Sequence, residues 1–186
     1  MDSRGYSTRK LPNILMVIKN HKHASHPTVI SNADETLLAL QEAFPELLIK
    51  KLMWHGLSQK EQISIAQDTD ILFSQPGSDV MNALFMPAGS SLLTPCRLLD
   101  MKWLYNKKGK EGTPPVRTVT EYGNEIMKWF QAMPDMRSMQ ICGDEDIKFD
   151  TKAYMIPATF NTDNIINDMR VIVDDWLERK LSRIYK

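Results

Sequence analysis

The sequence is short of cysteine and has no excess of either charge. Its 186 residues include two cysteines, Cys96 and Cys142, whose wide separation matches no metal-binding or redox motif. The 23 basic and 23 acidic residues give a formal net charge of +0. This balance gives no reason to expect a nucleic-acid partner, because proteins that bind nucleic acid carry a basic surface.

Glycine-rich phosphate-binding motifs are also missing. The eight glycines are scattered, and the chain contains neither Gly-x-Gly-x-x-Gly nor a Walker loop. Their absence argues against a dinucleotide-binding fingerprint and against a P-loop NTPase. His21, His23 and His26 lie close together without a nearby cysteine or carboxylate. We interpret them as loop residues rather than as metal ligands, and we expect no metal site.

Several short apolar runs are present and predict strands. The runs over 12–18 and 70–74 are apolar on both faces, as in strands that helices cover on both sides. Further strands are predicted at 47–54 and 91–93, and the lysines of the former favour a place near the sheet edge.

Helices are predicted between these strands. Asn32–Glu35 and Ser58–Glu61 both have the form of a capping box, which marks the start of a helix. The alternation of strands and helices predicts an α/β fold, a doubly wound parallel (Rossmann-like) sheet flanked by helices.

The pattern weakens after residue 95. We expect a flexible lead at 1–11 and one Rossmann-like domain at 12–186, with its core at 12–95. Within that domain the sequence predicts a long loop at 97–118, a helix at 119–131, a short strand at 138–142, an acidic loop at 144–150 and a C-terminal helix at 161–183.

The stretch from 70 to 94 is the candidate ligand site. After the strand, Gln75-Pro76-Gly77-Ser78-Asp79 forms a tight loop that opens a short helix, and Pro87 with Gly89 ends that helix. In α/β proteins, anions bind where a loop leaves the carboxyl end of a parallel strand and enters a helix. Asp79 would cap the helix, contact a sugar or ribose hydroxyl, or block anion binding.

This stretch resembles a known family. The run ILFSQPGSDVMNALFMPAGSSLL is similar to the C-terminal motif of glycosyltransferase family 61, an apolar strand, then His-Gly-Ala-Gly-Leu-Thr-Asn, an apolar helix and Pro-Gly. Gly77 matches the first motif glycine and Asn82 matches the asparagine. Pro76 stands at the position of the family's histidine, and Asp79 at the second glycine.

A second segment extends the resemblance. Leu57-Ser58-Gln59-Lys60-Glu61-Gln62 matches the family's "Leu-Ser-x-x-Glu-Gln" helix. Asn32 matches an asparagine that precedes an earlier helix, and Lys19 and Lys22 take the place of the family's arginines. The resemblance therefore spans residues 12–95.

The resemblance implies the nucleotide-sugar-binding lobe of a GT-B type glycosyltransferase. Such a lobe transfers a hexose or pentose from a nucleotide-sugar to a glycan or protein acceptor, without a required metal or other cofactor. The resemblance does not identify a catalytic residue. The residues implied to bind the nucleotide-sugar are Lys19, Lys22, Asn32, Gln75, Gly77, Ser78, Asp79 and Asn82. From the residues alone, Asn82 is equally well a buried amide that holds the loop.

Two alternatives remain open. A GT-B enzyme has two lobes, so the second would come from an N-terminal region outside this sequence or from a partner chain. Alternatively, the chain is a non-catalytic nucleotide-binding, glycan-binding or protein-interaction module, which the replacement of the histidine by Pro76 favours. A flavodoxin-like or response-regulator-like domain is a third interpretation, and the lack of an acidic cluster near the first strand counts against the latter.

The sequence contains no recognisable signal peptide or transmembrane run. We expect a cytoplasmic protein or, if these residues belong to a longer secretory-pathway enzyme, a protein of the Golgi lumen.

Overall fold

The fold is built around one five-stranded sheet. The computed structural model describes residues 1–18, 28–74, 78–95, 97–100, 117–120, 129–141, 147–149 and 156–184. The strands of the central sheet are β1 (Asn13–Val17), β3 (Leu48–Leu52), β4 (Ile71–Ser74), β5 (Ser91–Pro95) and β8 (Arg137–Ile141). Their order is β3-β1-β4-β5-β8, and every neighbouring pair is parallel. The predicted α/β fold with a parallel Rossmann-like sheet is confirmed.

The strand order has a switch point between β1 and β4. The chain leaves β1 to form β3 on one side and then returns to form β4 on the other side. Ligands of open α/β sheets bind at the carboxyl ends of the strands that flank such a switch point. The edge position predicted for β3 from its lysines is confirmed.

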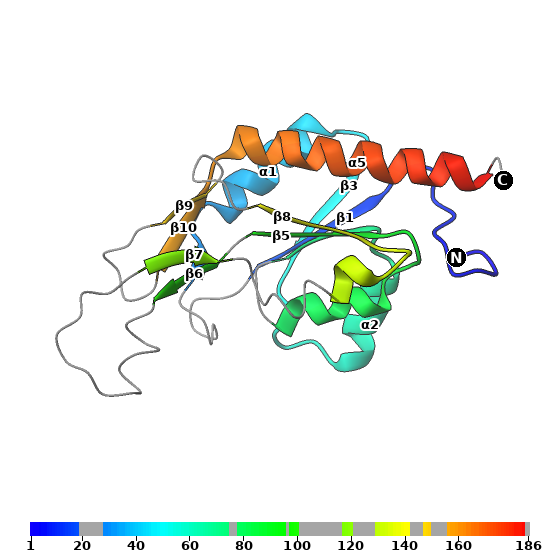
Figure 1. The fold of residues 1–186 in the computed structure, drawn as a ribbon, viewed down its shortest axis with the longest axis horizontal. Coiled ribbons are helices and arrows are strands. Elements are labelled where there is room, and N and C mark those ends of the chain that lie inside the picture. Colours follow the sequence, from blue (N-terminus) through cyan, green and yellow to red (C-terminus); the bar gives the residue numbers. More distant parts are fainter. Residues whose placement is uncertain are drawn as a thin grey trace.

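Helices cover both faces of the sheet (Figure 1). Helices α1 (Ala33–Ala43) and α5 (Thr162–Ile184) lie on one face, with the side chains of Ile14 and Met16 in that core. Helix α2 (Gln59–Gln67), the 3₁₀ helix η1 (Ser78–Phe85) and a helical turn at 129–132 lie on the other face. Leu15 and Val17 belong to that second core, as the period of two in a strand requires.

Two smaller sheets were not predicted from the sequence. One contains β2 (Thr28–Ile30), β10 (Ile156–Phe160) and β9 (Ile147–Phe149), and the other pairs β6 (Arg97–Asp100) with β7 (Arg117–Thr120). The acidic loop predicted at 144–150 is therefore wrong where it includes β9. The helix predicted from residue 119 is wrong at its first two residues, which belong to β7. Strands β6 and β7 form the two ends of the stretch predicted as a long loop.

The segment at 1–11, predicted to be a flexible lead, makes specific contacts at the amino-terminal rim of the sheet. Tyr6 forms a parallel bridge with Ala88, and its hydroxyl donates a hydrogen bond to Asp135 over 2.8 Å. Arg9 forms ion pairs with Asp68 and with Asp70. These contacts tie the start of the chain to the rim opposite the candidate ligand site.

Candidate functional site

The candidate site lies at the carboxyl-terminal rim of the sheet, where β1 and β4 end side by side. Val17 and Ser74, the last residues of the two strands, are partners in the register. The segments that start at residues 19 and 75 therefore follow neighbouring strand ends. These segments carry Lys19, Lys22, Gln75 and Gly77, which lie outside the described residues. The topology thus places the two strand ends that precede the predicted binding segments at one rim.

The short helix predicted after this loop is present, but as a 3₁₀ helix. Ser78 and Asp79 open η1, and Asp79 is half-buried in its first turn. Val80 and Ala83 are fully buried against the sheet and α2. The helix ends before Gly89, whose φ of +81° belongs to the left-handed region that glycine tolerates best. These contacts hold η1 against the sheet, and they thereby determine the position of its first turn at the rim.

Asn82 connects the two segments that carry the resemblance. Its amide nitrogen donates a hydrogen bond to the side-chain oxygen of Gln62 over 3.2 Å. The amide nitrogen of Gln62 in turn donates to the backbone carbonyls of Leu57 and Trp54. This chain of amides joins η1 to α2, so the structure gives Asn82 the role of holding the loop. Its predicted contact with a ligand stays a prediction.

The capping box at the start of α2 is confirmed. The Ser58 hydroxyl accepts a hydrogen bond from the backbone N–H of Glu61, and the Glu61 carboxylate accepts from the backbone N–H of Ser58 over 2.8 Å. The hydrogen bonds from Ser58 hold the pKa of Glu61 below its ordinary value. Glu61 is thus a structural carboxylate that positions α2 beneath η1.

Asn32 does not form the predicted capping box. No side-chain hydrogen bond caps α1 at this residue. Instead, the Asn32 amide donates to the Phe160 carbonyl over 2.9 Å and its oxygen accepts from the Phe160 N–H over 2.9 Å. The local pattern could not indicate a partner 128 residues away. The amide holds β10 and the start of α5 against the rim, and its predicted ligand contact stays a prediction.

Sequence analysis missed a polar row at the same rim. Thr94 is fully buried at the end of β5 and is the register partner of Gln140 in β8. Ser74, at the end of β4, is also fully buried. All three follow the alternation that sends Leu72 and Leu92 toward η1. In the sequence, the only sign of this row was that a polar residue ends a buried apolar strand. The strand register is needed to show that these side chains are neighbours.

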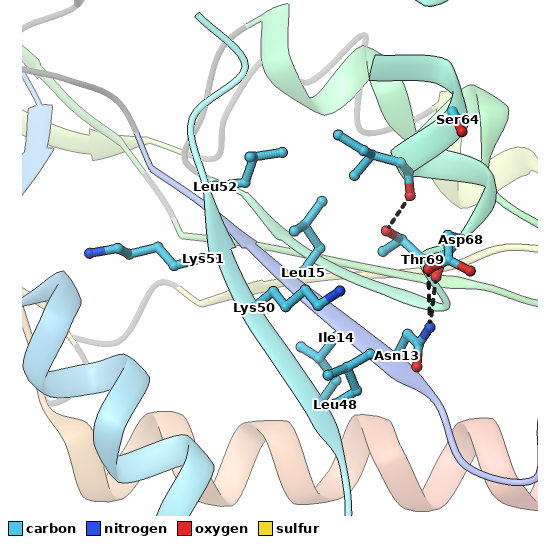
Figure 2. Close-up of a pocket in the computed structure, with 11 residues that line it drawn as sticks. Asn13, Ile14, Leu15, Leu48, Lys50, Lys51, Leu52, Ser64, Asp68 and Thr69 are labelled. Atoms are coloured by element: carbon cyan, nitrogen blue, oxygen red, sulfur yellow. Dashed lines mark hydrogen bonds between the residues drawn. The ribbon is translucent and has the colours of Figure 1, made fainter. Parts of the chain in front are cut away.

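A cavity of about 370 Å³ lies elsewhere, between β3, β1 and the end of α2 (Figure 2). Leu15, Leu52 and Ile65 give it apolar walls. The Lys50 side chain extends across it toward Asn13, while Lys51 points away and pairs with Asp34. None of the predicted site residues lines this cavity, so the structure separates it from the rim that the sequence indicates.

The described part of the chain lacks both a metal-binding cluster and a membrane-spanning helix. Within it, no three or more His, Cys, Asp or Glu side chains are grouped so that they could hold a metal ion. His21, His23 and His26 lie outside that part. Among the helices it contains, none is long and apolar enough to cross a membrane. Helix α5 reaches 23 residues but is strongly charged along its length.

Comparison with known proteins gave one family. The model of the family described as Glycosyltransferase 61 matches residues 3–93, from the lead to the middle of β5. No curated protein matched the chain. The match includes β1, β4 and η1, and therefore the rim at which the candidate site lies. Strand β8 and helix α5, which complete the sheet and its covering, lie outside the matched residues.

Proposed function

From the match of residues 3–93 to the glycosyltransferase 61 family, we propose that the chain is the donor lobe of a GT-B type glycosyltransferase. In this proposal the chain binds a nucleotide-sugar at the carboxyl-terminal rim of its sheet. The sugar is then transferred to a hydroxyl group of a glycan or protein acceptor. The family match supports a glycosyltransferase. The assignment of the chain as the donor lobe is our own proposal.

One observation supports this assignment most strongly. Strands β1 and β4 flank the switch point of a parallel sheet, and their last residues, Val17 and Ser74, are register partners. Each is followed by a segment in which the resemblance places ligand-binding residues. Because ligands of such sheets bind outside the carboxyl ends of the strands at this point, both segments would face one bound molecule.

The residues take complementary roles in the proposal. Lys19 and Lys22 neutralise the diphosphate, while the backbone N–H groups of Gly77 and Ser78 donate hydrogen bonds to it. Gln75 and Asp79 contact hydroxyl groups of the ribose or sugar. Asn32 and Asn82, whose amides are engaged with Phe160 and Gln62, hold the two segments in place.

The reaction follows from these roles. The acceptor oxygen attacks the anomeric carbon of the hexose or pentose while the bond to the diphosphate oxygen breaks, and the nucleoside diphosphate leaves with the electron pair. Cationic side chains and N–H groups stabilise the developing negative charge, so the proposal requires no metal ion. A base from a second lobe, on the same or a partner chain, takes the acceptor proton.

A second candidate function rests on Pro76. This residue stands where the family has its histidine, and a proline ring can neither accept nor donate a proton. The alternative is therefore a non-catalytic module that binds a nucleotide, a glycan or another protein on the same fold.

Isothermal titration calorimetry tests the donor lobe. UDP, GDP and their sugar conjugates are titrated into the protein with and without a divalent metal, and we expect one nucleotide to bind specifically. Lys19→Ala with Lys22→Ala should abolish that binding, because the diphosphate loses both cations. Lys10→Ala, an exposed lysine of the lead, is the matched control and should bind normally. Absence of binding at millimolar nucleotide would contradict the proposal.

The same titration separates the alternatives when it is followed by an assay of sugar transfer. Release of the nucleoside diphosphate that depends on an acceptor supports the enzyme. Nucleotide binding without any transfer, even with candidate second lobes supplied, supports the non-catalytic module.

A further inference from the structure

The polar row at the carboxyl-terminal rim contains atoms that need a partner. The buried Thr94 hydroxyl has no hydrogen-bond partner among the described residues, and neither does the side-chain nitrogen of Gln140. Native proteins rarely leave buried polar atoms unpaired, since each loses its bonds to water without a replacement. Two such atoms on register partners of two paired strands therefore point to a missing binding partner.

The two side chains share one face. Thr94 is the register partner of Gln140, and register partners in a parallel sheet point to the same side. Thr94 also points to the same side as Leu92, because residues two apart in a strand do so. Both polar atoms thus lie on the face that η1 covers.

Their position relates them to the proposed donor site. Strand β5 lies next to β4, and β8 lies one strand farther, about 10 Å from β4 at the usual spacing of strands. The proposed diphosphate site lies at the ends of β1 and β4. A ligand that extends from there along the rim reaches β5 and β8 next.

The chemistry of the row selects a neutral, hydroxyl-bearing group. The Thr94 hydroxyl can both donate and accept hydrogen bonds, and the Gln140 nitrogen can donate two. Neither side chain is charged, so they offer nothing that neutralises a phosphate. Sugar hydroxyl groups, which both donate and accept, complement such a set.

We propose that Thr94 and Gln140 form the subsite that binds the sugar hydroxyl groups of the donor. This assignment rests on the proposed donor-lobe function. It goes beyond the family match, because Thr94 lies one residue past the matched segment and β8 lies outside it. Both residues are specificity-determining, since they contact the transferred sugar and not the nucleotide.

Calorimetry with paired ligands tests the subsite. The dissociation constants of a nucleoside diphosphate and of its sugar conjugate are measured for the wild type, for Thr94→Val and for the double variant Thr94→Val with Gln140→Met. The double variant should bind the conjugate about tenfold more weakly, which corresponds to about 1.4 kcal/mol. Its affinity for the free diphosphate should be unchanged.

A matched control and a second variant complete the design. Ser90→Ala removes another buried hydroxyl without a partner, but at the opposite rim, and should leave both affinities unchanged. Gln140→Met alone is the second variant, for use where the double variant does not fold. The single variants should unfold at the same or a higher temperature than the wild type, because each removes an unpaired polar atom.

The outcomes distinguish the two proposals. Equal affinity losses for the conjugate and the free diphosphate, or no loss for either, would overturn the subsite while leaving the donor lobe intact. Failure of the wild type to bind any nucleotide would overturn the donor lobe and the subsite together. A loss confined to the sugar conjugate supports both.

Discussion

Replacing Asn32 by alanine should destabilise the protein far more than the loss of a helix cap would. The Asn32 amide makes two hydrogen bonds of 2.9 Å to the backbone of Phe160, one as donor and one as acceptor. Phe160 is 4% exposed, and its ring lies 5.3 Å from that of Phe73 at the end of β4. Water would not readily replace the lost amide at this position.

The magnitude follows from the two bonds. A buried backbone group left without a partner costs about 1–3 kcal/mol, so two such groups cost about 2–6 kcal/mol. For a chain of this length each kcal/mol lowers the melting temperature by about 2–4 °C. A loss of about 3 kcal/mol therefore corresponds to a decrease of about 6–12 °C.

Urea denaturation and thermal unfolding would measure the change, with two comparison variants. Asn161→Ala removes an exposed amide that only weakly caps α5, at 3.5 Å from the Asn164 nitrogen, and should cost about 1 kcal/mol or less. Asn32→Asp retains the acceptor but loses the donor and places a carboxylate against the Phe160 carbonyl. The carbonyl raises the pKa of this carboxyl group in the folded state, and protonation restores a donor, so the deficit should shrink as the pH falls toward about 4.

Two results would refute the reasoning. If Asn32→Ala cost no more than Asn161→Ala, the bonds to Phe160 would not stabilise the rim. If Asn32→Ala left stability unchanged but abolished nucleotide binding, the direct ligand contact implied by the resemblance would replace the structural role.

Three other changes have defined outcomes. Asn82→Ala and Gln62→Ala should each cost about 1 kcal/mol, and the double variant should cost less than their sum in a double-mutant cycle of urea denaturation, whereas full additivity would deny the contact. Burial lowers the pKa of Lys180, so the unfolded chain binds the proton more strongly; stability should rise as the pH increases toward about 10.5, and Lys180→Met should flatten that rise. Gly89→Ala should cost about 1–3 kcal/mol in thermal unfolding because of the φ of +81°, and an unchanged melting temperature would contradict that conformation.

The central strands could be predicted from the sequence because their signals are local. The apolar runs at 12–18 and 70–74 correspond to β1 and β4, with ends displaced by at most one residue. Strands buried on both faces read as continuous apolar runs. The same was true of the helix start at Ser58, where both partners of the capping box lie within four residues of sequence.

Features that depend on distant partners could not be predicted. The Asn32 side chain bonds to Phe160 in place of its own helix, because a pair of bonds to a buried backbone replaced the local cap. Strands β2 and β9 have three residues each, too few for a periodic pattern. The polar row formed by Thr94 and Gln140 becomes visible only through the pairing of β5 with β8.

A crystal structure of the protein with a bound nucleotide-sugar would test the account most directly. We predict that the diphosphate lies at the carboxyl ends of β1 and β4 and that the sugar extends toward Thr94 and Gln140. Density for the ligand in the cavity between β3 and α2 (Figure 2), or at the amino-terminal rim, would contradict the proposed donor site.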